Sequence, residues 1–337
     1  MKNALGLVLL ALATVAFSAH SAEVNVYSAR KEALIKPVLD TFSEQTGIKV
    51  NLITGNADAL ISRIASEGKF SPADVLITTD VGRLHRAKSQ DLLQSVTSNE
   101  LSQHVPARLR DADNQWFALT KRARTIMYSK DRVSAEELSD MESLTDEKWK
   151  GRICIRSSSN IYNQSMVAAL IEQLGEQATL AWAKGLVKNF ARPPKGGDRD
   201  QIKAVAAGQC DIAIANTYYL AGMLTDSDPS QVKAAEAVAV FWPNQENRGV
   251  HVNISGAGVA RHAPNKDAAV RLLEYMLTAE AQAWYAEHNG EYPVREGVEQ
   301  SPVLVQFGDF KAEDIPLQRV GQLNAEALVL MDKAGWK

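Results

Sequence analysis

Three tyrosines, Tyr162, Tyr218 and Tyr219, are the residues whose type and position best suit a chemical role. Each is predicted to lie in the first turn of a helix that directly follows a strand. Open α/β sheets bind their ligands at the carboxyl ends of strands, so the three phenols are expected to face a common cleft. For the pair Tyr218 and Tyr219, the alternative is that they are aromatic core residues that cap a sheet.

Phenol oxygens at one point would suit a hard, highly charged cation. A free tyrosine titrates near about pH 10, so a strong positive charge is needed to hold a phenolate at neutral pH. Fe³⁺ supplies that charge, and three phenolates balance it, which favours a partly buried site. The sequence has no His and Cys spacing typical of zinc and no acidic cluster typical of calcium.

Arg122 and Arg124 form a second candidate group. With Thr120 they alternate along a predicted strand that runs from 121 to 128, after a separate strand segment at 115–119, so their side chains share one face. A strand at a solvated sheet edge is one explanation for such charges. If the face lines a cleft, the two guanidinium groups could instead hold a small dianion such as carbonate.

The elements that must position these residues follow a β-α-β-α-β order. Predicted strands at 23–28, 48–53 and 73–77 are separated by helical patterns, and the theme repeats from residue 150 onward. This order is typical of a doubly wound α/β sheet. Two such units with short crossings between them predict two lobes, a hinge and a ligand cleft between the lobes.

Composition and the first residues indicate an exported globular protein. Of the 337 residues, 45% are hydrophobic and 23% charged, and the net charge of −3 argues against nucleic-acid binding. Met1-Lys2, an apolar run from 4 to 17 and small residues up to Ala22 predict a cleavable signal peptide, cut after Ala22 or Ser21. A buried N-terminal helix is the alternative.

The two cysteines, Cys154 and Cys210, are both predicted to lie at strands of the second unit. An exported protein meets an oxidising compartment, where a disulfide can form. The sequence leaves open whether these residues form that bond or stay as two buried free thiols.

The chain resembles the periplasmic ferric-ion-binding proteins, which are the substrate-binding components of bacterial iron ABC transporters. The resemblance covers essentially the whole mature chain, and the adjacent tyrosine pair is its most specific mark. The stretches that carry it are Val26–Glu32, Leu119–Arg124, Ser159–Asn163 and Ala215–Tyr219. It implies that Tyr162, Tyr218 and Tyr219 are metal ligands and that Arg122 contacts a bound anion.

The sequence departs from this family after the first strand. Members often have a His or a His-Tyr pair there, whereas this chain has Arg30-Lys31-Glu32. The first lobe is therefore expected to give no ligand, or only Glu32, which leaves positions for carbonate, bicarbonate, citrate or water. Arg30, Glu32, Arg122 and Arg124 are together the candidates for binding the anion or supporting the site.

The resemblance implies a two-lobed periplasmic binding protein of type II, with a mixed, mostly parallel sheet and flanking helices in each lobe. After a signal peptide at 1–22, the expected N-terminal lobe is 23–122 plus 251–300, and the C-terminal lobe is 123–250 plus 301–337. The implied function is Fe³⁺ capture by a monomer in the periplasm and delivery to a permease of the inner membrane. The same fold binding a phosphonate, sulfate, thiamine or a polyamine is the alternative.

An exported enzyme, such as a hydrolase, is a third possibility. The sequence has no G-x-S-x-G element and no histidine close to a candidate serine or cysteine. The sequence therefore favours a binding protein over an enzyme.

Overall fold

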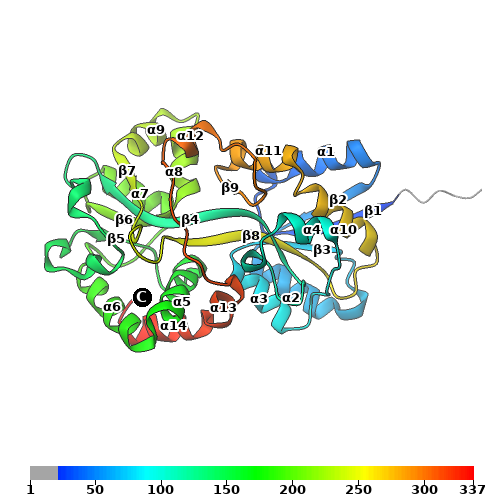
Figure 1. The fold of residues 1–337 in the computed structure, drawn as a ribbon, viewed down its shortest axis with the longest axis horizontal. Coiled ribbons are helices and arrows are strands. Elements are labelled where there is room, and N and C mark those ends of the chain that lie inside the picture. The colour runs from blue at the N-terminus through cyan, green and yellow to red at the C-terminus, as the bar shows by residue number, and fades with distance from the viewer. Residues whose placement is uncertain (1–21) are drawn as a thin grey trace, which may run out of the picture.

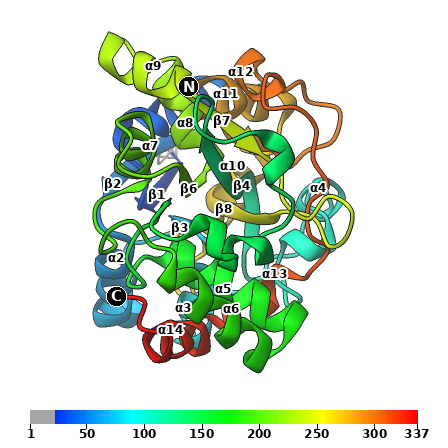
Figure 2. The same cartoon turned by 90° about the vertical axis from the view of Figure 1, so that its left-hand side faces the viewer.

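The computed structural model describes residues 22–337, and the predicted signal peptide lies outside them except for its last residue. The helices and strands gather into two lobes joined by two long strands (Figure 1). One lobe holds β1–β3 and the other holds β5–β7, and Figure 2 views the molecule from the side of the β5–β7 lobe. This agrees with the two-lobed α/β architecture expected from the sequence.

The first lobe is built on parallel strands flanked by helices. β1 pairs with β2 on one side and β3 on the other, each in parallel. Its strands are β1 (Glu23–Ser28), β2 (Lys49–Thr54) and β3 (Val75–Thr79). Its helices are α1 (Lys36–Thr46), α2 (Ala57–Glu67), α3 (Val81–Ser89), α4 (Asn99–His104), α10 (Lys266–Tyr275) and α11 (Ala279–Asn289).

Helix α2 illustrates how local sequence sets these elements. The Asn56 side chain accepts hydrogen bonds from the backbone N–H groups of Asp58 and Ala59, which satisfies two donors at the helix start. Leu60, Ile61 and Ile64 form the buried face, and Gly68 follows the last residue. The capping residue and the apolar spacing therefore define both the ends of the helix and the side that packs on the sheet.

The second lobe repeats the pattern with shorter strands. β5 pairs in parallel with β6, and β5 has only 2 residues. Its strands are β5 (Ile153–Cys154), β6 (Ile212–Asn216) and β7 (Val238–Phe241). Its helices are α5 (Ile161–Leu174), α6 (Glu176–Lys188), α7 (Asp198–Ala206), α8 (Thr217–Leu224), α9 (Pro229–Glu236) and α12 (Pro302–Val305).

Two long antiparallel strands join the lobes. β4 (Phe117–Ser129) pairs with β8 (His251–Val259), so the two segments predicted at 115–119 and 121–128 form one strand. The sheet order is β2-β1-β3-β8-β4-β6-β5, with β7 and β9 (Tyr292–Pro293) also pairing with β4. The pairs made by β4 and β8 are antiparallel, which gives the sheet more antiparallel character than expected.

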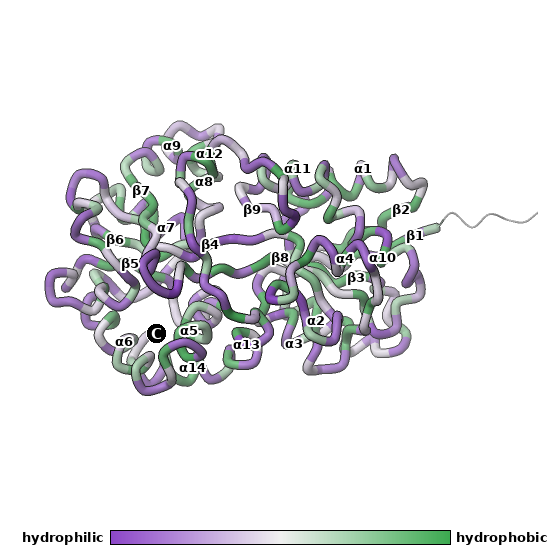
Figure 3. Tube along the Cα trace, in the orientation of Figure 1, coloured by the Kyte–Doolittle hydropathy of each residue, from purple (hydrophilic) through white to green (hydrophobic). Residues whose placement is uncertain are grey.

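The middle of β4 is hydrophilic between two apolar ends, as the purple stretch along the strand in Figure 3 shows. Arg122 and Arg124 are nevertheless buried, with about 1% of each residue exposed. The explanation by a solvated edge strand is wrong, because β4 lies in the interior of the sheet and is paired on both sides. Buried guanidinium groups need partners, and the site supplies them.

The chain ends with two helices that contact both lobes. α13 (Leu317–Gln322) packs against α3 and α5, and α14 (Asn324–Lys333) packs against α5 and α6. The two helices are separated by Leu323. Within residues 22–337, no helix is both long enough and apolar enough to cross a membrane.

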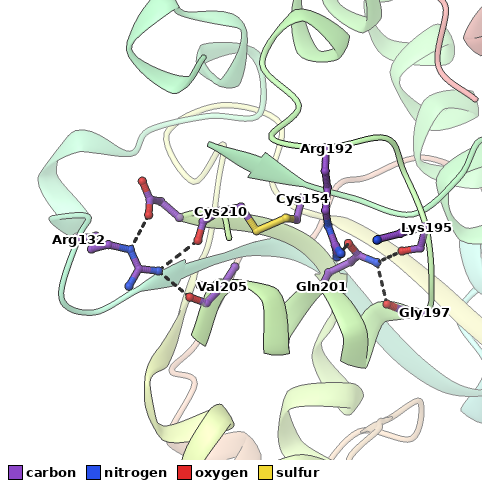
Figure 4. Close-up of a disulfide and its surroundings, with 9 residues drawn as sticks. Arg132, Cys154, Arg192, Lys195, Gly197, Gln201, Val205 and Cys210 are labelled. Carbon is purple, nitrogen blue, oxygen red and sulfur yellow. Dashed lines mark hydrogen bonds and ion pairs between the residues drawn. A yellow bond between two sulfur atoms is a disulfide. The ribbon is translucent and has the colours of Figure 1, made fainter. Parts of the chain in front are cut away.

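Cys154 and Cys210 form a disulfide, with their Cα atoms 5.9 Å apart (Figure 4). It connects β5 to the segment that leads into β6, so the bond ties down the start of the element that carries Tyr218. Arg132 donates hydrogen bonds to the carbonyl oxygens of Val205 and of Cys210 itself. The disulfide is therefore one of several links that fix this segment.

Candidate metal centre

A cavity of about 490 Å³ lies between the lobes and gathers the three predicted tyrosines. Tyr162, Tyr218 and Tyr219 line it from the second lobe, and residues of the β1–α1 connection line it from the first. The structure therefore brings together three phenols that are 57 residues apart at their widest spacing, 162 to 219. All three side chains are partly exposed, consistent with rings that face an open cavity.

Tyr162 is held by the start of α5. The Asn160 side chain accepts a hydrogen bond from the Tyr162 backbone N–H at 3.1 Å, which fixes the first turn. Burial opposes ionisation of the phenol. The positive charge of Arg122 and hydrogen bonds with Tyr218 and Thr79 outweigh it, so the pKa of Tyr162 lies below its ordinary value.

Tyr218 and Tyr219 occupy the first turn of α8 with their ring centres 4.3 Å apart. Burial raises the pKa of both, and the neighbouring Tyr162 phenol raises both further. The Tyr162 phenol thus ionises more easily than a free tyrosine, whereas Tyr218 and Tyr219 keep their protons in the absence of a cation. Like-charged groups that share one site resist joint ionisation in this way.

A buried network around Glu291 forms the floor beside these phenols. Glu291 accepts from Arg30 at 3.0 Å, from Arg122 at 3.1 Å and from the Thr120 hydroxyl at 2.7 Å. Burial opposes a charged carboxylate, but the two arginines hold the pKa of Glu291 below its usual range. The network joins β4 to the segment after α11, and two cations around one anion leave it positively charged.

Arg122 also contacts the tyrosines directly. Its guanidinium carbon lies 5.5 Å from the ring centre of Tyr218, and its Nη1 donates to the Ile254 carbonyl at 2.6 Å. Its Nη2 donates to the Ser255 hydroxyl. The guanidinium is thus held in place while its charge favours ionised phenols nearby.

Arg124 lies behind the tyrosines and does not line the cavity. It donates to Asn163 at 2.6 Å and to Asp198 and Asn216 at 3.1 Å each. Asn163 follows Tyr162, and Asn216 precedes the tyrosine pair, so Arg124 connects the two helix starts that carry the phenols. Asn216 occupies the cap position of α8, but its oxygen accepts from Arg124 and makes no capping bond.

The structure places Glu32 away from the tyrosines. It is exposed in a short 3-10 helix, Glu32–Leu34, and lines a different depression with Lys36 and Asp40. The first-lobe side of the central cavity instead presents Lys31 and the partnered Arg30. Arg199, His288 and Asn289 also line it, and Arg199 pairs with Asp226 at 2.9 Å.

Glu291 was not predicted from the sequence, where its segment is simply a Gly-Glu-Tyr-Pro turn. The sequence did contain one indication of such an acid. Arg122 and Arg124 lie on one strand face, and arginines that become buried require a nearby carboxylate. The sequence did not indicate which acid would supply it. In the described residues 22–337, no cluster of three or more His, Cys, Asp or Glu side chains is placed to hold a metal ion.

The chain is similar along its length to proteins that handle iron. It matches the family model described as bacterial extracellular solute-binding protein over residues 38–312. It is 51% identical to iron uptake protein A1 of Synechocystis, with 94% of this chain and 88% of that protein covered. It is 28% identical to the major ferric iron-binding protein of Neisseria meningitidis, with both chains fully covered.

A solved structure of the Trichodesmium protein (IdiA, FutA) in complex with iron and citrate ligands has the same fold. It superposes with a TM-score of 0.91 at 51% identity, covering 94% of this chain and all of the other. These matches confirm the resemblance inferred from the sequence motifs. The chain therefore belongs to the bacterial extracellular solute-binding protein family, among its iron uptake and ferric iron-binding members.

Proposed function

We propose that this protein binds ferric iron in the interlobe cavity through Tyr162, Tyr218 and Tyr219 and delivers it for uptake. The observation that carries the proposal is that the three phenols line one cavity. Together they supply three negative charges when ionised, which equals the charge of Fe³⁺. A hard trivalent ion paired with hard oxygen donors is a chemically matched combination.

The proposed binding step is an exchange of protons for metal. Tyr218 and Tyr219 hold their protons in the free protein because their pKa values are raised. An arriving Fe³⁺ displaces them, and the compensated charge removes the repulsion between the phenolates. Arg122 stays beside the ring of Tyr218 and offsets part of the negative charge. The lobes would then close about the hinge strands β4 and β8.

An anion completes the proposed site. Three phenolates leave coordination positions on the metal, and the first lobe presents Lys31 where relatives often have a metal ligand. Carbonate, bicarbonate or citrate can fill those positions, and a cationic first-lobe wall favours such an anion. A 51% identical relative has been solved in complex with iron and citrate, which supports a small carboxylate or carbonate as the anion.

We assign the protein to transport rather than catalysis, and to a monomer that works with an ABC permease of the inner membrane. Relatives named as periplasmic support export through the predicted signal peptide at 1–22. The proposed lobes are 23–122 plus 251–300 and 123–250 plus 301–337. The last of these ranges includes α13, which also contacts α3 of the first lobe.

Binding of a phosphonate or another organic ligand is less well supported. The arginines that could hold an oxyanion are already engaged, Arg30 and Arg122 with Glu291 and Arg124 with Asp198. An oxyanion alone would also make less use of the three tyrosines than a metal ion does, since a neutral phenol offers it one hydrogen bond and no charge.

The test is a titration of the purified mature protein with ferric citrate. We expect a visible phenolate-to-iron absorption band that saturates at one iron per protein and a raised melting temperature. The Tyr218→Phe, Tyr219→Phe double variant should lose the band, whereas Tyr128→Phe, a change on β4 outside the cavity, should keep it. A band that survives in the double variant contradicts the proposal, as does a phosphonate that stabilises the protein when iron does not.

A further inference from the structure

A second large cavity lies on the opposite face of β4 from the tyrosines. Its volume is about 550 Å³, and its walls come from β4, β8, β9 and the segment from 295 to 312. It is therefore located where the strands cross between the lobes, and β9 lies beside β4 there (Figure 1). Nothing in the metal centre uses this cavity.

Strand alternation explains why Lys121 belongs to this cavity. Thr120 and Arg122 point to the Glu291 network, so Lys121, which lies between them, points to the other face of the sheet. Lys121 is directly opposite Tyr292 in the antiparallel β4–β9 pair. Residues paired in this way have neighbouring side chains on one face, and both line the cavity.

Both side chains have polar groups without protein partners. The Tyr292 residue is 4% exposed, and its buried hydroxyl has no hydrogen-bond partner. In the part of the chain that the structure describes, the half-buried Lys121 ammonium makes no hydrogen bond and no ion pair. A partnerless ammonium and a partnerless buried hydroxyl are costly unless something else satisfies them.

The charged groups around the cavity are mixed, with three cations and two carboxylates when Lys121 is included. Arg108 and Arg295 line it with Lys121, against the carboxylates Glu296 and Asp309. Arg295 already donates to the Leu277 carbonyl at 3.1 Å. The Arg108 Nε lies 3.9 Å from an Asp314 carboxylate oxygen. Within residues 22–337, Arg295 and Lys121 make no ion pair, and of these two cations Lys121 also makes no hydrogen bond.

We propose that this cavity binds a small oxyanion, a carboxylate or a phosphate, held by the Lys121 ammonium and the Tyr292 hydroxyl. The two groups are complementary to such a ligand, because one supplies charge and the other a neutral donor. Burial raises the pKa of Tyr292, so its hydroxyl stays a donor at neutral pH. Burial and the nearby Arg108 lower the pKa of Lys121, Glu296 raises it in part, and a bound anion would further favour the charged ammonium.

The experiment titrates the iron-free mature protein separately with inorganic phosphate and with acetate, measured by calorimetry. We expect saturable binding of at least one of the two, and the one that binds identifies the source of the oxyanion. Lys121→Met should weaken it by about 10- to 100-fold, and Tyr292→Phe by about three- to tenfold. Lys184→Met, which removes an exposed lysine of α6, should leave it unchanged.

Comparison of the variants separates this site from the central cavity. An anion that binds beside the tyrosines would give the same isotherm in Lys121→Met as in the wild type, and that result would overturn the proposal. The absence of saturable binding of both anions would overturn it too. Lys121→Met removes an unpaired charge and should fold at least as stably as the wild type, which a thermal melt of each variant verifies.

Discussion

Replacement of Tyr219 by phenylalanine gives the sharpest test of how the three phenols work. The change removes one hydroxyl and keeps the ring that packs 4.3 Å from the Tyr218 ring, so the fold should be preserved. It removes one proposed oxygen donor and one acidic proton. The substitution should therefore change both the iron affinity and the dependence of that affinity on pH.

The direction of the pH dependence follows from the phenol pKa values. Those of Tyr218 and Tyr219 are raised, so both groups are protonated at neutral pH and must lose their protons when Fe³⁺ binds. Each such proton makes the apparent affinity rise about tenfold per pH unit. These two phenols give about 100-fold per pH unit, and Tyr162 adds up to about another tenfold while it is protonated.

The Tyr219→Phe variant should lose one factor of about ten per pH unit relative to the wild type. Its affinity at neutral pH should fall by more than about 100-fold. Loss of a residue that only orients a metal ligand typically costs about 10- to 100-fold, and here a ligand itself is removed.

The assay is competition for iron against one chelator from about pH 6 to pH 8, followed by the phenolate-to-iron band. Protons released or taken up by the chelator and by ferric hydroxide species are the same for both proteins. The difference in slope between wild type and variant therefore counts the protons that belong to Tyr219 alone.

Equal slopes in the wild type and in Tyr219→Phe would refute the reasoning, whatever the loss of affinity. Such a result would mean that the Tyr219 hydroxyl gives up no proton to bind iron. Tyr128→Phe is the matched control, because it removes a phenol from β4 near the β6 pairing and outside the cavity. It should match the wild type in both affinity and slope.

Three further predictions concern the surroundings of the site. Arg122→Met leaves the buried Glu291 with one fewer cation and should lower the free energy of unfolding in urea by about 3 kcal/mol, part of which the added change Glu291→Gln restores. The double change Cys154→Ala, Cys210→Ala opens a loop of sequence separation 56 and should cost about 4 kcal/mol of unfolding free energy, with reductant having no effect on the variant. Glu32→Gln should leave iron affinity unchanged in the competition assay, since Glu32 does not line the cavity; a loss of tenfold or so would assign it a role in binding.

Several features of the site follow from local sequence. The tyrosines could be placed at helix starts because apolar strand patterns, an Asn cap and helical spacing are all short-range signals. The β-α-β order and the two-lobed plan followed from the same signals, and the motifs pointed to the family. The strand limits were less accurate, since β4 is one continuous strand where two segments were predicted.

The partners of the charged residues were decided by the tertiary structure. Arg122 and Arg124 have the same residue type on one strand face, yet one is next to the tyrosine ring and the other joins two helix starts. Glu291, which is 169 residues from Arg122, could not be identified from the sequence as its counter-ion. The formation of the Cys154–Cys210 bond was likewise undetermined.

The sequence by itself thus determined which residues open each helix, which faces are apolar and which donors the chain offers. Only the tertiary structure decided which tyrosines share a cavity, which cationic side chains are already paired with a carboxylate and which remain free to bind a ligand. The physical reason is that capping and periodicity act over a few residues. Burial and ion pairing depend on what long-range packing places within a few ångströms.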